Sequence, residues 1–296
     1  MALVSTPEDR FDGLPGYDYP ADSVSVGEPD MAYVDVPGDG DETFLCLHGE
    51  PTWGFLYRRM VDRLAERGRV VVPDFIGFGR SDKYTERGAY SFRLQYDALV
   101  TFIEDLDLTG VTLVCQDWGG LLGLTAAANH AERFARLVPM NTDVPSGTQT
   151  MPPEWHAFHE FVESADELQI GRLVDAGCTS SLSDDIRAAY DAPFDDEASK
   201  AGAYAWPDLV PRADGGDGHE LVGAARETLA SWEKPAFVLF SDSDPITGPA
   251  RDGLRELIPT AGDQPDTWIE GAGHFLQEDA GPAVADEIVA FVDRTP

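Results

Sequence analysis

Short apolar runs alternate along most of the chain with longer segments in which apolar residues recur at helical spacing. The runs are rich in β-branched residues and lie at residues 43–47, 70–73, 111–116, 136–140 and 235–240. Between them, residues such as those of the segment 91–106 repeat bulky apolar side chains every three or four positions. This alternation predicts an α/β fold in which a mostly parallel sheet, built with right-handed crossovers, carries helices on both faces.

The alternation is interrupted at two places. Residues 1–30 are rich in Pro, Gly and Asp, which predicts an irregular arm leading into an edge strand at 31–36. Between 143 and 220 the strand pattern gives way to short helical patches and acidic clusters, which predicts an inserted helical cap. The expected organisation is a core of residues 1–142 and 221–296 with a cap of residues 143–220.

The run at residues 111–116 ends in an unusual way. Cys115 and Gln116 are followed by Asp117, Trp118 and Gly119, and a helix-forming segment comes next. Strand, sharp turn and helix with the pattern small-x-nucleophile-x-Gly are typical of a nucleophile elbow, here with an aspartate at its centre. Because a carboxylate can displace a leaving group from an sp³ carbon and form an ester that water later cleaves, Asp117 is the candidate nucleophile.

Two further polar residues follow predicted strands later in the chain. Asp244 comes after the strand at 235–240, and His274 comes after a short strand at 267–269. Nucleophile, acid and histidine in this order are typical of α/β-hydrolase catalytic triads. Asp242 and Asp143 also follow strands, so both stay open as alternatives for the acid.

Several of these stretches resemble one enzyme family, the haloalkane dehalogenases, over roughly residues 20–294. The resemblance rests on the stretches 48–53 (HGEPTW), 116–120 (QDWGG) and 273–278 (GHFLQE). It is closest to the subfamily exemplified by the Xanthobacter 1,2-dichloroethane enzyme, in which the acid follows the later strand. Asn141 stands where the other main subfamily has its glutamate, which favours Asp244 as the acid.

The resemblance implies a two-step mechanism. Asp117 would displace halide and become an alkyl ester, and His274, oriented by Asp244, would activate the water that cleaves it. Backbone N–H groups of Glu50 and Trp118 would form the oxyanion hole. The reaction requires water and no cofactor, and no His/Cys/Asp/Glu spacing in the sequence predicts a metal site.

The leaving halide would be held by indole N–H groups, which donate hydrogen bonds and cannot accept them. Trp118 is one expected donor, and Trp155 in the cap corresponds to the second donor of the resembled subfamily. Trp206 is the alternative for this second role, although its stretch resembles an apolar wall of the family.

The sequence leaves two other functions open. An epoxide hydrolase shares the HGxP stretch and the aspartate elbow, and would use cap tyrosines such as Tyr190 and Tyr204 to protonate the epoxide oxygen. A non-catalytic receptor of α/β-hydrolase fold would bind a small ligand under the cap. The complete set of nucleophile, acid and histidine argues against such a receptor.

The chain is strongly acidic. It has 54 acidic and 21 basic residues and a formal net charge of −33, yet 43% of its residues are hydrophobic. This hydrophobic content predicts a folded core, and the charge opposes binding to nucleic acids or anionic membranes. Adaptation to high salt is the preferred interpretation, because molar salt screens the self-repulsion; an acid-rich protein of an ordinary cell is the alternative.

The sequence also predicts where the protein works. Cys46 and Cys115 fall in predicted core strands, and an odd total of three cysteines is typical of free thiols in a reducing cytoplasm. The first residues have neither a basic region nor an apolar core, so no signal peptide is expected, and no apolar run is long enough to span a membrane. The expected partners are a small halogenated substrate and a halide ion, and a monomer is the expected state.

Overall fold

The computed structural model of the chain describes residues 2–148, 150–212 and 216–295. Within them, the central sheet has the strand order β2-β3-β5-β4-β7-β8, and β4, β5, β7 and β8 are parallel. The strands are β2 (Ala21–Ser25), β3 (Asp30–Val36), β4 (Glu42–Leu47), β5 (Gly68–Pro73), β7 (Val111–Gln116) and β8 (Phe134–Met140). Every residue of β7 is buried, as expected of a strand covered on both faces. The predicted mostly parallel α/β sheet is confirmed.

The sheet continues beyond β8 with the last two predicted strands. The backbone N–H of Phe237 donates to Leu137 O at 2.8 Å, and that of Leu239 donates to Pro139 O at 3.0 Å, so this segment runs along β8. It ends in β9 (Phe240–Ser241), which pairs in parallel with β10 (Trp268–Ile269). The loops after β9 and β10 carry Asp244 and His274 to the same edge of the sheet as Asp117.

One prediction about the sheet is wrong. The strand expected at the edge, β3, lies between β2 and β5, and β2 falls inside the arm expected to be irregular. In β2 only Val24 is partly buried, and its other four side chains are exposed. A strand that buries so little apolar surface has no apolar alternation by which the sequence could reveal it. A further antiparallel pair joins β1 (Leu3–Val4) to β6 (Lys83–Tyr84).

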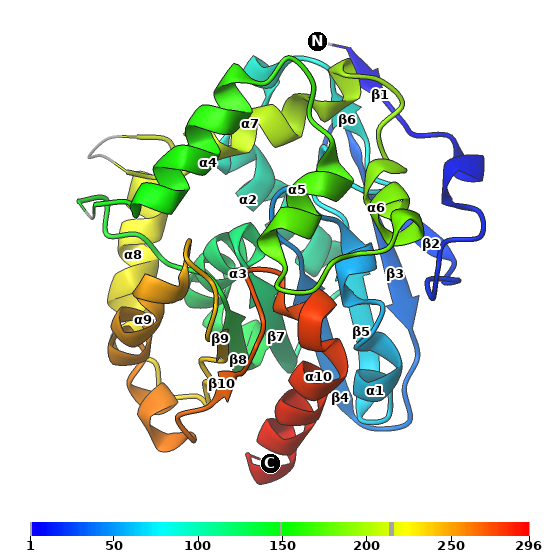
Figure 1. Cartoon of the computed structure of the whole chain (residues 1–296). Coiled ribbons are helices and arrows are strands. Elements are labelled where there is room, and N and C mark those ends of the chain that lie inside the picture. Colours follow the sequence, from blue (N-terminus) through cyan, green and yellow to red (C-terminus); the bar gives the residue numbers. More distant parts are fainter. Residues whose placement is uncertain (1, 149, 213–215, 296) are drawn as a thin grey trace.

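Helices pack on this sheet as the periodicity predicted. The core helices are α1 (Val61–Ala65), α2 (Phe92–Asp105), α3 (Trp118–Asn129), α8 (His219–Leu229), α9 (Arg251–Leu257) and α10 (Leu276–Arg294). Helix α1 contacts α10, whereas α2 and α8 both contact α3 (Figure 1). Helix α10 is interrupted at Ala280, whose φ of −138° is not helical, just before Pro282.

The segment predicted to form the cap is helical. It contains α4 (Pro153–Ser164), α5 (Ile170–Gly177), α6 (Asp184–Asp191) and α7 (Ala201–Leu209), which lie together over one end of the sheet (Figure 1). Helix α8 begins at His219 and packs on α3 of the core. None of the helices in the described part of the chain is both long and apolar enough to cross a membrane.

Candidate active site

Asp117 occupies a strained turn between β7 and α3. Its φ of 51° and ψ of −124° are unusual for a residue with a side chain, and such strain is typical of nucleophile elbows. The turn is held because the Asp117 N–H donates to Asn141 O at 3.0 Å and the Thr142 hydroxyl donates to Asp117 O at 2.6 Å. Gly119 is required here, since a Cβ at this position would lie 2.2 Å from Leu47 O.

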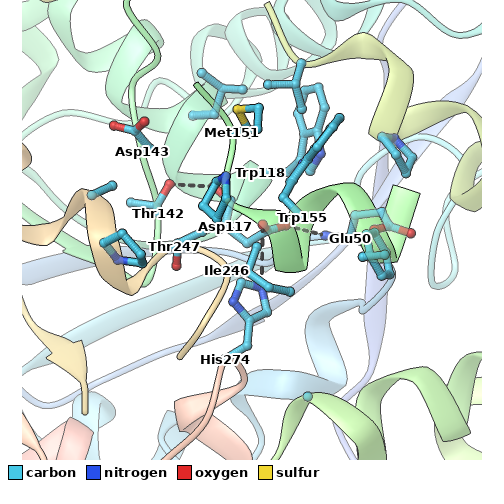
Figure 2. Close-up of a pocket in the computed structure, with 18 of the residues that line it drawn as sticks. Glu50, Asp117, Trp118, Thr142, Asp143, Met151, Trp155, Ile246, Thr247 and His274 are labelled. Atoms are coloured by element: carbon cyan, nitrogen blue, oxygen red, sulfur yellow. Dashed lines mark hydrogen bonds and ion pairs between the residues drawn. The ribbon is translucent and has the colours of Figure 1, made fainter. Parts of the chain in front are cut away.

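The Asp117 side chain faces a cavity of about 400 Å³ between core and cap (Figure 2). The lining includes Glu50, Asp117, Trp118 and His274 from the core and Trp155 from α4. The remaining wall is largely apolar and includes Leu121, Pro145, Met151, Phe158, Leu173, Val210, Ile246 and Phe275. A cavity of this size and polarity fits a small apolar molecule that carries one reactive group.

The imidazole of His274 lies between two carboxylates. Its Nδ1 is 3.0 Å from Asp244 Oδ2, and its Nε2 is 3.6 Å from Asp117 Oδ2. Asp242 accepts a hydrogen bond from Gly271 N instead, and Asp143 accepts one from Val144 N. Of the three candidate acids, the structure therefore brings Asp244 to the histidine.

Asp117 and Asp244 carry charges that shift the pKa of His274, and His274 in turn shifts the pKa of Asp244. Burial would raise the pKa of Asp244, but His274 and hydrogen bonds from Thr247 and the Ile246 N–H lower it to about 2. Burial would lower the pKa of His274, but Asp244 and Asp117 outweigh this effect and raise it to about 10. Asp244 is thus ionised at neutral pH, and His274 binds a proton tightly while Asp117 carries its negative charge.

Glu50 follows β4 and contacts the nucleophile through its backbone. Its N–H donates to Asp117 Oδ1 at 2.9 Å. Trp118 is the first residue of α3, where a backbone N–H has no partner within the helix, so its amide can serve the same carboxylate. His48 lies in the loop that leads from β4 to Glu50, and it fixes this loop because its Nε2 accepts a hydrogen bond from the Phe75 N–H at 2.9 Å. Burial lowers the pKa of His48 to about 4, so the ring is neutral.

Two indoles line the cavity. Trp118 and Trp155 are 5% and 6% exposed and both belong to its wall (Figure 2). Trp206 is fully buried outside this wall, where it packs against Trp118 and Phe78 with ring centroids 4.8 and 4.6 Å apart. The Arg212 guanidinium lies over the Trp155 ring, 4.7 Å from its centroid.

The two cap tyrosines considered for an epoxide hydrolase lie elsewhere. Tyr190 is fully buried and its hydroxyl donates to Glu278, whereas the Tyr204 hydroxyl donates to Glu197. Neither of them lines the cavity. Within the described ranges, no group of three or more His, Cys, Asp or Glu side chains could hold a metal ion.

Three features of the site were not predicted from the sequence. The Gln116 side-chain nitrogen lies 3.1 Å from His274 Nε2. The Asn141 amide donates to the carbonyl oxygens of Gly273 and His274 at 3.0 and 2.9 Å, so it holds the histidine loop and does not contact the imidazole nitrogens. The Glu50 carboxyl is buried with one oxygen lacking a hydrogen-bond partner, and burial together with Asp117 raises its pKa well above the usual range. Of these residues, only Asn141 is linked to the choice of the acid by the sequence, because it stands where the other main subfamily has its glutamate.

The chain is similar to known proteins over most of its length. A family model described as alpha/beta hydrolase fold matches residues 42–281. A haloalkane dehalogenase of Mycobacterium marinum is 42% identical over 98% of this chain and 100% of its own length. One of Psychrobacter cryohalolentis is 38% identical over the full length of both chains. Among solved structures, the tetrameric haloalkane dehalogenase DpaA from Paraglaciecola agarilytica NO2 superposes with a TM-score of 0.90, is 37% identical, and covers 97% of each chain.

Proposed function

The chain belongs to the haloalkane dehalogenases of the α/β-hydrolase superfamily, and we propose that its reaction runs through an alkyl ester on Asp117. As a haloalkane dehalogenase, it hydrolyses haloalkanes to an alcohol and a halide ion. The observation that carries the proposed mechanism is the position of the Asp117 carboxylate, which lies in the cavity wall between the Glu50 N–H and His274 Nε2.

In the first step, a carboxylate oxygen of Asp117 attacks the carbon that bears the halogen. The carbon–oxygen bond forms as the carbon–halogen bond breaks, and the halide leaves with the bonding electron pair. We propose that the indole N–H groups of Trp118 and Trp155 bind the halide, because both side chains line the same apolar cavity as the nucleophile.

In the second step, His274 takes a proton from a water that attacks the carbonyl carbon of the ester. Negative charge then develops on the Asp117 oxygen, where the Glu50 N–H already donates a hydrogen bond and where Trp118 N–H is a second donor. Collapse of this intermediate releases the alkoxide, which takes up the proton from His274 and leaves as the alcohol. Asp244 stabilises the imidazolium formed in between.

We also propose that the chain belongs to the subfamily of the Xanthobacter 1,2-dichloroethane enzyme. This proposal is supported by the contact between Asp244 and His274 and by the Asn141 amide, which bonds to backbone carbonyls of the histidine loop. A cytoplasmic location is proposed as well, supported by the unpaired cysteines, of which Cys46 and Cys115 are buried in the sheet. A monomer remains our proposal for the oligomeric state.

The mechanism is tested by trapping the ester. The variant His274→Phe lacks the base of the second step only, so we expect one equivalent of bromide from 1,2-dibromoethane and an alkyl group retained on Asp117. Mass spectrometry of the peptide that contains Asp117 detects the adduct. In wild-type enzyme turned over in heavy-oxygen water, the same peptide should acquire heavy oxygen. If neither label appears on Asp117 while wild-type enzyme releases bromide, the ester mechanism is wrong.

A further inference from the structure

The halide pocket lies in a molecule whose charge opposes anions. The cavity wall contains the carboxylate of Asp117 and the imidazole of His274, and within the described residues no lysine or arginine belongs to it. With a formal net charge of −33, the surrounding protein adds a long-range field that disfavours a negative ion. Binding of the product halide therefore depends strongly on the few positive groups close to its donors.

Arg212 is placed to act on one of these donors. Its guanidinium carbon is 4.7 Å from the centroid of the Trp155 ring, within the range of cation–π contacts. Trp155 is 6% exposed, and His159 stacks on its ring with centroids 5.0 Å apart and an interplanar angle of 27°. The indole is therefore held in place in the wall of the cavity.

A cation over an indole face changes the indole itself. The positive charge draws electron density from the ring, and the N–H group becomes a stronger hydrogen-bond donor. The same charge also lowers the electrostatic energy of an anion bound at that N–H. Both effects favour halide over a neutral ligand at the same position.

We propose that Arg212 tunes the halide site by polarising the Trp155 indole from outside the cavity. The proposal rests on the proposed function, because it requires that Trp155 donates to the halide. Arg212 is a positioning and tuning residue in this scheme and does not touch the reacting atoms. It strengthens binding of the departing halide and thereby also assists carbon–halogen cleavage.

The test compares Arg212→Met with Arg212→Lys and with Arg172→Met. Arg172 lies in α5 and is exposed, so its removal subtracts the same charge from the cap without touching the cavity wall. The readout is the inhibition constant of bromide in steady-state kinetics, with ionic strength held constant by potassium glutamate. Arg212→Met should weaken bromide binding about two- to fivefold, whereas Arg212→Lys should keep most of the affinity and Arg172→Met all of it.

A double-mutant cycle separates tuning of the indole from a general structural effect. In a Trp155→Phe background the N–H is absent, so Arg212→Met should have little further effect on bromide binding. An equal loss in both backgrounds, or unchanged bromide inhibition in Arg212→Met, would overturn the inference. The proposed function would stand in either case if the His274→Phe variant still accumulates the Asp117 ester.

Discussion

In the proposed mechanism Asp117 changes charge during the reaction, and this change controls the pKa of His274. As a free carboxylate it helps Asp244 to raise the pKa of His274 to about 10, which keeps the imidazole protonated at neutral pH. Once Asp117 is esterified it is neutral, and its part of this stabilisation of the imidazolium is lost. The pKa of His274 must then fall, so alkylation itself prepares the base that the second step needs.

The variant Asp117→Asn mimics the neutral ester. We expect the pKa of His274 to be lower in Asp117→Asn than in the wild type, because removal of a negative charge 3.6 Å from Nε2 disfavours the protonated form. Titration of the imidazole nitrogens by NMR measures this shift. The control is Asp242→Asn, since Asp242 is exposed and bonds to the Gly271 N–H. An equal or higher pKa in Asp117→Asn would contradict the proposed coupling.

The sequence indicates a candidate site residue when that residue lies directly after a predicted strand. Asp117 and His274 were proposed in this way, because parallel strands deliver the residues after them to one edge of the sheet. Asp244 shared this feature with Asp242 and Asp143 and was favoured by the family resemblance; the structure places Asp244 beside His274. The contacts of Gln116 and of the Glu50 carboxyl could not be predicted. They depend on which way a side chain turns inside a packed interior, and neither spacing nor periodicity encodes that.

Among the secondary-structure elements, a buried polar network joins the cap to α10, the helix that follows His274. Glu278, near the start of α10, pairs with Arg58, with 2.7 Å between Nη2 and Oε2, and also accepts a hydrogen bond from Tyr190 of α6. The Glu278 and Arg58 side chains are only 2% and 6% exposed. Because a buried carboxylate must be fully satisfied to be tolerated, this network fixes α6 relative to α10.

We expect Tyr190→Phe to lower the free energy of unfolding by about 1.5–3 kcal/mol, the usual effect of losing a buried hydrogen bond to a charged group. The rate of ester formation should change little, since Tyr190 does not line the cavity. The matched control is Tyr19→Phe, whose hydroxyl donates to the exposed Asp62 and should contribute about 0.5 kcal/mol or less. Urea unfolding curves of both variants test this. Equal stability losses would show that the buried network has no special role.

The elements themselves were largely predictable, and the exception is instructive. The buried strands and α2 bury continuous runs or one regular face of apolar residues, and this pattern is what the sequence displays. Strand β2 is held mainly by its backbone pairing with β3, while its side chains Asp22, Ser23 and Ser25 are exposed. Backbone hydrogen bonds are available to any sequence, so a strand stabilised by them alone carries no side-chain signature.

For the whole molecule, the positions of the basic residues matter as much as the net charge for how the protein responds to salt. All three lysines donate hydrogen bonds to backbone carbonyls: Lys83 is completely buried, and Lys200 and Lys234 are partly buried. They therefore do little to offset the charge of the chain's 54 acidic residues. We propose on this basis that the protein is adapted to high salt, because the repulsion among its acids is weakened when the screening length shortens.

We expect the thermal unfolding midpoint to rise as KCl increases from about 0.1 M to 2 M, a range over which the screening length falls from about 10 Å to about 3 Å or less. Circular dichroism at several salt concentrations measures the midpoint. Potassium glutamate at equal ionic strength serves as the control, since a screening effect depends on ionic strength and not on the identity of the anion. A midpoint independent of salt would count against this adaptation.

Chloride is both a salt ion and the product released from chlorinated substrates. If chloride bound the halide site with a dissociation constant of about 1 mM, molar chloride would occupy about 99.9% of sites and exclude substrate. An enzyme adapted to salt must therefore bind chloride poorly. A pocket with two indole donors and a largely apolar wall can achieve this, because it does not replace the strong hydration of chloride, while bromide is less costly to dehydrate.

We expect chloride to bind the halide site with a dissociation constant on the order of 0.1–1 M. Brominated substrates should be preferred over chlorinated ones, and KCl should inhibit only weakly compared with potassium glutamate at equal ionic strength. Kinetic titration with both salts measures this inhibition, and a chloride inhibition constant in the millimolar range would contradict a halide site adapted to salt.

The same titration with bromide distinguishes between the two candidate tryptophans for the second halide donor. Trp155→Phe should lose bromide affinity, whereas Trp206→Phe should retain it, because the buried Trp206 N–H lies outside the cavity wall and has no hydrogen-bond partner to lose. The reverse result would assign the second halide donor to Trp206.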